Sequence, residues 1–66
     1  MNIEKLKSKI IENELSISET ARLMGIDKSS LYRKLKNHDT VTIGEADKLK
    51  RILNLTDWEA LEIFLR

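Results

Sequence analysis

The sequence predicts an all-α domain built from five helices. Apolar residues recur at three- and four-residue spacing in five segments of the 66-residue chain, and three of these segments open on Ser or Thr followed three residues later by Glu. The chain contains no proline and only two glycines, so no stretch has the composition of a flexible linker. These observations favour one compact domain over residues 1–66, without internal repeats.

The first helix is expected over about Ile3 to Glu14. Ile3, Leu6 and Ile10 share one face of that helix, and charged side chains lie between them. Because residues three and four apart lie on the same side of a helix, the apolar face is predicted to enter the core and the charged face to meet water.

The second helix is expected to begin near Ile17. Ser16 and Glu19 form a capping box, in which each side chain satisfies a backbone amide of the other residue. Gly25 is predicted to end the helix, because a residue without Cβ readily takes the left-handed conformation found at many helix ends. The inward positions are predicted to be Ile17, Thr20, Ala21 and Met24, with Leu23 on a shoulder.

The third helix is expected from about Lys28 to Lys36, with Asp27 as its N-cap. At 100° per residue only Leu31 and Leu35 form an inward stripe. The outward face has no acid after Asp27 and collects hydroxyl and basic side chains, namely Ser29, Tyr32, Arg33 and Lys36, with Lys28 at the helix start. Such a surface offers hydrogen-bond donors suited to phosphates and base edges.

Positive charge is concentrated on this part of the chain. The net charge is only +1, but residues 22–36 carry five bases against one acid, whereas residues 37–66 carry four bases against six acids. A local basic patch on a nearly neutral chain favours binding in a nucleic-acid groove over general coating of polyanions. The alternative is a charged helix face that is merely solvated.

The second and third helices together resemble the helix-turn-helix of phage repressors, Cro proteins and the wider XRE-type bacterial regulators. The matching stretch is SISETARLMGIDKSSLYRKLK. In that family a small residue, a turn glycine and a branched apolar residue hold the positions of Ala21, Gly25 and Leu31. The resemblance covers most of the chain and implies a compact five-helix, lambda-repressor-like fold with its helix-turn-helix over about residues 17–36.

The resemblance implies that the third helix enters the major groove of double-stranded DNA. Base contacts are then expected from Lys28, Ser29, Tyr32 and Arg33, with Arg33 the best candidate for a bidentate contact to guanine. Phosphate contacts are expected from Ser16, Ser18, Lys36, Asn37 and His38. Ile17 departs from the family pattern, since a Gln that braces the DNA backbone often stands there, and Ser16 and Ser18 are possible substitutes.

A loop over residues 37–41 and a fourth helix are expected next. Thr42 and Glu45 form a second capping box, and Asn54 is a suitable residue to end the helix. The inward positions of this helix are predicted to be Ala46, Leu49 and Leu53.

The fifth helix is expected from about Asp57 to the C-terminus, opened by a third capping box between Thr56 and Glu59. The residues predicted to close the core share one face: Trp58, Leu61 and Leu65, with Phe64 on its shoulder. Ile63 falls on the other side, near Ala60. We therefore expect an exposed apolar patch that gives a two-fold dimer contact, formed by Ile52, Ala60, Ile63 and Phe64. Isolated surface apolar residues are the alternative.

Catalysis and metal binding are not expected. A chain of 66 residues buries too little surface for a deep active site, and it has no cysteine and a single histidine. His38 adjoins Asp39, but neighbouring residues rarely present their side chains to one point. No cofactor or small-molecule ligand is indicated. No apolar run approaches the roughly 20 residues that span a bilayer, and no signal-peptide core is evident, so a cytoplasmic location is expected.

The predicted function is that of a small transcriptional regulator, repressor- or Cro-like and of phage or mobile-element type, which binds double-stranded DNA sequence-specifically. A homodimer is expected, with association in free solution weak or absent, because two recognition helices on a two-fold axis read half-sites about one DNA turn apart. The alternative is a protein-interaction module, such as an antirepressor, that uses the helix-turn-helix only as a scaffold and binds another regulator through Ile52, Ile63 and Phe64.

Overall fold

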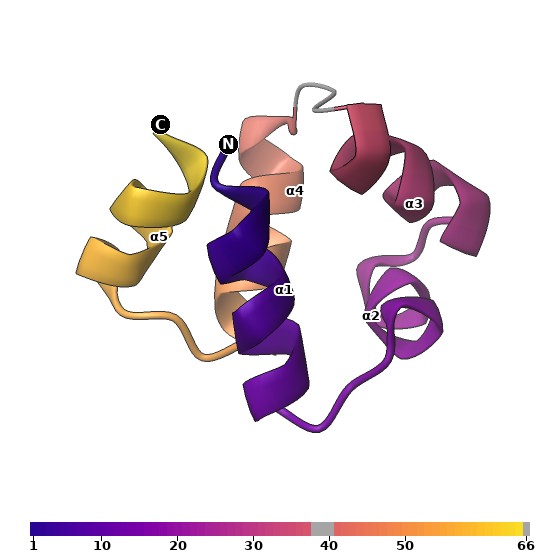
Figure 1. Cartoon of the computed structure of the whole chain (residues 1–66), viewed down its shortest axis with the longest axis horizontal. Helices are drawn as coiled ribbons and strands as arrows, with labels where there is room; N and C mark the ends of the chain where they lie inside the picture. Colours follow the sequence, from indigo (N-terminus) through magenta and orange to yellow (C-terminus); the bar gives the residue numbers. More distant parts are fainter. Residues whose placement is uncertain (38–40, 66) are drawn as a thin grey trace.

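A computed structural model describes residues 1–37 and 41–65, and all regular structure within those ranges is helical (Figure 1). The helices are α1 (Ile3–Glu12), α2 (Ile17–Met24), α3 (Lys28–Asn37), α4 (Ile43–Ile52) and α5 (Asp57–Phe64). The predicted five-helix, all-α fold is confirmed. Four boundaries differ from the prediction: α1 ends two residues earlier, α4 ends at Ile52 before Leu53, α5 ends at Phe64 before Leu65, and Asn37 belongs to α3 rather than to the following loop. Residues 38–40 of the predicted loop lie outside the described residues.

Hydrogen bonds between neighbouring residues fix the starts of three helices, as predicted. In each capping box the hydroxyl oxygen of Ser or Thr accepts a bond of 3.0–3.1 Å from the backbone amide of Glu, and the Glu carboxylate accepts one of 2.9–3.0 Å from the backbone amide of Ser or Thr. The three pairs are Ser16–Glu19 on α2, Thr42–Glu45 on α4 and Thr56–Glu59 on α5. These starts are therefore specified locally.

The bend between α2 and α3 occurs at Gly25, which has φ = +77°. A Cβ added there would meet nothing within 4 Å, so the backbone conformation, and not crowding, favours glycine. Glu14 and Asn54 adopt positive φ after α1 and α4 without being glycine. The predicted break of the chain at position 25 is confirmed, and α2 and α3 are separate helices.

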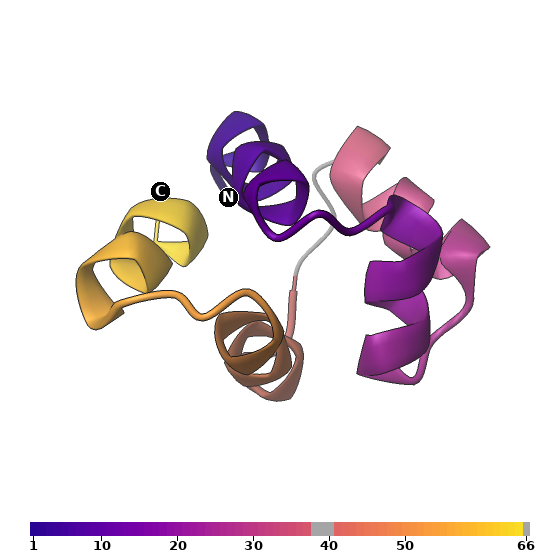
Figure 2. The ribbon, with the colours of Figure 1, turned by 90° about the horizontal axis from the view of Figure 1, so that it is seen from below.

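All five helices contribute to one apolar core. Helix α2 packs on α3 and α4, and α5 packs on α1 and α4. Figure 2 shows α2 and α3 on one side of the molecule and α5 on the other. The buried apolar residues are Ile3, Leu6, Ile10, Ala21, Met24, Leu31, Leu35, Leu49, Leu53, Leu55 and Ile63. Most inward positions predicted for the first four helices are buried, while Ile17 and Ala46 are half-buried and Leu55 was not predicted.

The orientation predicted for the last helix is wrong. Ile63 is fully buried, with 0% of its surface exposed, whereas Trp58 and Leu65 are 70% and 75% exposed. Ile52 and Phe64 are half-buried and pack against the core. An exposed dimer patch that includes Ile52, Ala60, Ile63 and Phe64 therefore does not exist as predicted, because its central residue lies inside the molecule.

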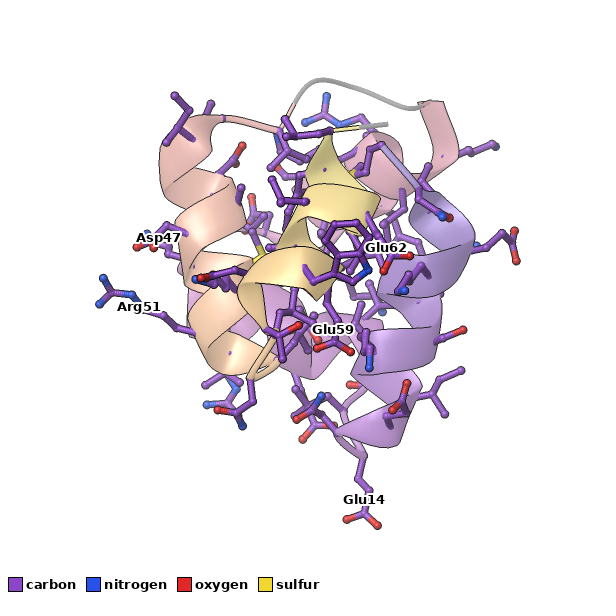
Figure 3. The ribbon with its side chains drawn as sticks, turned by 90° about the vertical axis from the view of Figure 1, so that its left-hand side faces the viewer. Glu14, Asp47, Arg51, Glu59 and Glu62 are labelled. Atoms are coloured by element: carbon purple, nitrogen blue, oxygen red, sulfur yellow. The ribbon has the colours of Figure 1, made fainter. Side chains whose placement is uncertain are left out.

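Contacts with α1 explain why α5 turns this face inward. The carboxylate of Glu59 pairs with the ammonium group of Lys9, and that of Glu62 lies 2.8 Å from the ammonium group of Lys5. The backbone amide of Asn2 donates a hydrogen bond of 2.7 Å to the carbonyl of Ile63. Figure 3 shows Glu59 and Glu62 on the side of α5 that faces α1. Since residues 59, 62 and 63 lie on the same face of a helix, the ion pairs and the burial of Ile63 require the same orientation.

Candidate nucleic-acid interface

Helix α3 lies at the edge of the molecule with one face buried and the other exposed (Figure 1). Leu31 and Leu35 attach it to the core, with 2% and 5% of their surfaces exposed. The opposite face exposes the side chains predicted to meet DNA: Lys28, Ser29, Tyr32, Arg33 and Lys36. The predicted division of α3 into an apolar anchor and a polar outer face is confirmed. The carbonyl of Asp27 accepts a bond of 3.2 Å from the amide of Leu31, which puts Asp27 at the predicted N-cap position.

Lys28 and Tyr32 contact each other on this outer face. The ammonium nitrogen of Lys28 lies 5.9 Å from the centre of the Tyr32 ring, which is within the range of a cation–π interaction. The two residues are one helical turn apart, so the contact needs no distortion of α3. It holds a positive charge and an aromatic ring together at the N-terminal half of the helix.

The start of α2 supplies a second group of exposed polar side chains. Ser16 and Ser18 are both exposed. The Ser16 hydroxyl oxygen accepts a hydrogen bond from the Glu19 amide, so its own proton can still be donated to another group. Ile17, which stands where the family often has a polar residue, packs partly against the core. The predicted contacts from the side chain of Asn37 and from His38 lie outside the described residues.

Three of the four bases on α3 form no ion pair with a described carboxylate, a larger share than on the other helices. On the other described helices, carboxylates pair with four of the seven bases, Lys5, Lys9, Lys50 and Arg51, and not with Lys7, Arg22 or Lys48. Among the residues that the structure describes, no carboxylate lies within ion-pair distance of Lys28, Arg33 or Lys36. The side chains on the outer face of α3 therefore present positive charge that no neighbouring described carboxylate neutralises, which favours attraction of a polyanion.

Helix α4 contacts both helices of the helix-turn-helix through polar side chains. The Lys34 ammonium nitrogen lies 3.2 Å from a Glu45 carboxylate oxygen, and the Lys48 ammonium group donates a bond of 3.2 Å to the carbonyl of Met24. Hydrogen bonding from the Thr42 amide, together with the nearby Lys34, holds the pKa of the Glu45 carboxyl below its usual value. These contacts were not predicted, because neither pair has a spacing that places its members on one helix face.

Neither a metal site nor a membrane span is apparent over residues 1–37 and 41–65. No three His, Cys, Asp or Glu side chains in these ranges gather as metal ligands would. None of the helices described there is both long and apolar enough to cross a membrane.

Comparison with known protein families agrees with this geometry. Residues 5–63 match the profile of the Cro/C1-type HTH DNA-binding domain, and the match includes α2, the turn at Gly25 and α3. Searches of curated proteins and of solved structures found no match. Because the family profile covers most of the chain, the sequence resemblance to XRE-type regulators is confirmed: the chain belongs to the Cro/C1-type helix-turn-helix DNA-binding domains.

Proposed function

We propose that this chain is a sequence-specific transcriptional regulator, repressor- or Cro-like and of phage or mobile-element type, that inserts α3 into the major groove of operator DNA. Membership of a DNA-binding family supports double-stranded DNA as the partner. The choice of helix rests on the exposed outer face of α3, where no described carboxylate lies within ion-pair distance of Lys28, Arg33 or Lys36. Binding of this kind involves no bond-breaking step, so we infer that the chain is not an enzyme, and we infer a cytoplasmic location.

The contacts with DNA fall into two proposed classes. Lys28, Ser29, Tyr32 and Arg33 would reach base edges, with Arg33 donating two hydrogen bonds to guanine. Phosphates would be held by Ser16, Ser18, Lys36, Asn37 and His38. The described members of the second class, Ser16, Ser18 and Lys36, are exposed, as a phosphate contact requires.

We further propose that two copies bind one operator and meet through α5. Trp58 and Leu61 on that helix, with Leu65 directly after its last residue, form an exposed apolar face. Three such side chains offer on the order of 400 Å² per copy, which is below the roughly 800 Å² per partner of a standard stable interface. Association would therefore be weak in free solution and would be completed on DNA.

The arrangement of α3 and α5 is compatible with such a dimer. The two helices lie at opposite ends of the molecule, whose longest extent is 27 Å (Figure 1). Two copies joined at α5 would hold their α3 helices at opposite ends of the pair, related by a two-fold axis. This geometry suits an operator with two-fold symmetry.

Selection of bound sequences from a random duplex pool tests the proposal directly. We expect a two-fold symmetric motif and an affinity that falls steeply as salt rises, because lysine and arginine contacts release counterions. Absence of any association with duplex DNA at low salt would favour the alternative, a protein-interaction module that uses the apolar face of α5 to bind another regulator.

A further inference from the structure

Lys34 differs from the other bases of α3 in that a carboxylate holds it. Its ammonium nitrogen lies 3.2 Å from the Oε1 atom of Glu45, and the two side chains are only 21% and 20% exposed. Lys28, Arg33 and Lys36 are exposed on the same helix. One lysine of the recognition helix is therefore directed toward α4, whereas its neighbours face solvent.

Glu45 is itself fixed by the backbone of α4. The same Oε1 atom accepts a hydrogen bond of 3.0 Å from the amide of Thr42, and the amide of Glu45 donates a bond of 3.1 Å to the Thr42 hydroxyl oxygen. The first bond holds the carboxylate and the second fixes the backbone of the same residue, so the carboxylate loses little further freedom when it binds an ammonium group. It is a rigid acceptor for Lys34.

Lys48 lies on the same face of α4 as Glu45 and contacts α2, the other helix of the helix-turn-helix. It lies three residues after Glu45 and donates a hydrogen bond of 3.2 Å to the carbonyl of Met24, in the last turn of α2. Because residues three apart lie on one side of a helix, a single face of α4 holds α2 through Lys48 and α3 through Glu45. The position of Lys34 is thus part of the packing between helices.

We propose that Glu45 is a specificity-determining residue that holds Lys34 against α4, away from DNA phosphates, and so limits binding to DNA of unrelated sequence. This inference rests on the proposed function, in which α3 contacts DNA. A lysine that reaches a phosphate strengthens binding to any duplex, since the contact releases a counterion and does not depend on the base. If one lysine of α3 makes no such contact, base recognition supplies a larger share of the binding free energy.

The test measures the salt dependence of binding to a random-sequence duplex for a small set of variants. Glu45→Gln retains the acceptor oxygen of the capping box but removes the charge that holds Lys34. We expect it to steepen the slope of log affinity against log salt by about 0.9, the value for one added phosphate contact, and to raise affinity for the random duplex by up to about eightfold near 0.1 M salt. Its affinity for the selected operator should rise less, because base contacts fix α3 there.

Lys34→Met identifies the source of the effect. In the otherwise unchanged chain this variant should leave the slope as it is, because Lys34 makes no phosphate contact to lose. Combined with Glu45→Gln, it should return the steepened slope to its original value. Glu59→Gln is the matched control, because Glu59 also closes a capping box and pairs with a lysine, but on α5, and it should not change the slope.

Three results would overturn the inference: a flatter slope for Lys34→Met alone, an unchanged slope for Glu45→Gln, or equal steepening with and without Lys34. If α3 does not contact DNA, the result is different, since Lys36→Met would then also leave the slope of log affinity against log salt unchanged. Thermal unfolding of each variant, followed by circular dichroism, checks that the fold is retained.

Discussion

Lys9 of α1 and Glu59 of α5 form an ion pair, and the same Glu59 carboxylate accepts the hydrogen bond that closes the capping box of Thr56. These bonds lower the pKa of Glu59 from 4.5 to about 2, with the bond from Lys9 as the largest cause. One carboxylate thus joins the start of α5 to the first helix of the chain.

Acid should weaken the fold partly through this residue. Because the pKa of Glu59 is lower in the folded than in the unfolded chain, its contribution is present above about pH 4.5 and is lost as the pH falls toward 2. Glu59→Gln should therefore reduce the loss of unfolding free energy over that range, as measured by urea unfolding at a series of pH values. Glu45 and Asp57, whose pKa values are also lowered, remain in the variant, so the difference between the two curves isolates Glu59. Parallel curves would contradict this assignment.

Substitution of Arg33 and of Lys36 should weaken DNA binding in different ways. Arg33→Ala is expected to cost about 1–3 kcal/mol on the selected operator and to relax the preference at one base, because it removes a bidentate contact. Lys36→Ala should weaken binding to all sequences alike and flatten the salt slope. Binding titrations on operator and random duplexes separate the two. Equal losses on both duplexes for both variants would refute the proposed division of contacts.

Replacing each of the two glycines with alanine should change the free energy of unfolding in opposite directions. Gly25→Ala is expected to destabilise the fold by about 1–2 kcal/mol, because position 25 has φ = +77° although space for a Cβ is available. Gly44→Ala should stabilise it by about 0.5–1 kcal/mol, because Gly44 lies within α4 and a Cβ there would make only an ordinary contact at 3.9 Å. Denaturant unfolding measures both. A loss well above 2 kcal/mol at position 25 would point to crowding instead of backbone strain.

Ile63 and Leu65 provide a sharp test of the orientation of α5. Ile63→Ala should lower the free energy of unfolding by about 2–5 kcal/mol, because it empties a fully buried site. Leu65→Ala, at a position that is 75% exposed, should change it by about 0.5 kcal/mol or less. If Leu65→Ala lowered the free energy of unfolding more than Ile63→Ala, the orientation predicted from the sequence pattern would be correct.

The apolar face of α5 should matter for binding two copies to DNA, and not for folding. Replacing Trp58 and Leu65 with Ser should abolish cooperative occupation of a two-fold operator and leave thermal unfolding of the free protein nearly unchanged. Sedimentation of the protein–DNA complex gives the stoichiometry. Cooperative binding of the double variant at full strength would exclude this face as the contact between copies.

Features that depend on neighbouring residues were predictable from the sequence, and features that depend on packing were not. The capping boxes and the turn at Gly25 are local, so their residue types specify them directly. The orientation of α5 was mistaken because Trp58, Leu61 and Leu65 have helical spacing and large apolar surfaces, and the sequence does not show that α1 holds the opposite face. The Lys34–Glu45 pair was missed for the same reason, since it joins separate helices.

The hydrogen bond from the Asn2 amide to the Ile63 carbonyl joins parts of the chain that are far apart in sequence. Bringing such distant segments together carries a larger loop-closure entropy than forming the turn between α2 and α3. We therefore expect α5 to dock late in folding and to open first in the native state, with faster amide hydrogen exchange than α2. A second copy bound on α5 would slow that exchange, so assembly on the operator would also protect the helix that we expect to open first.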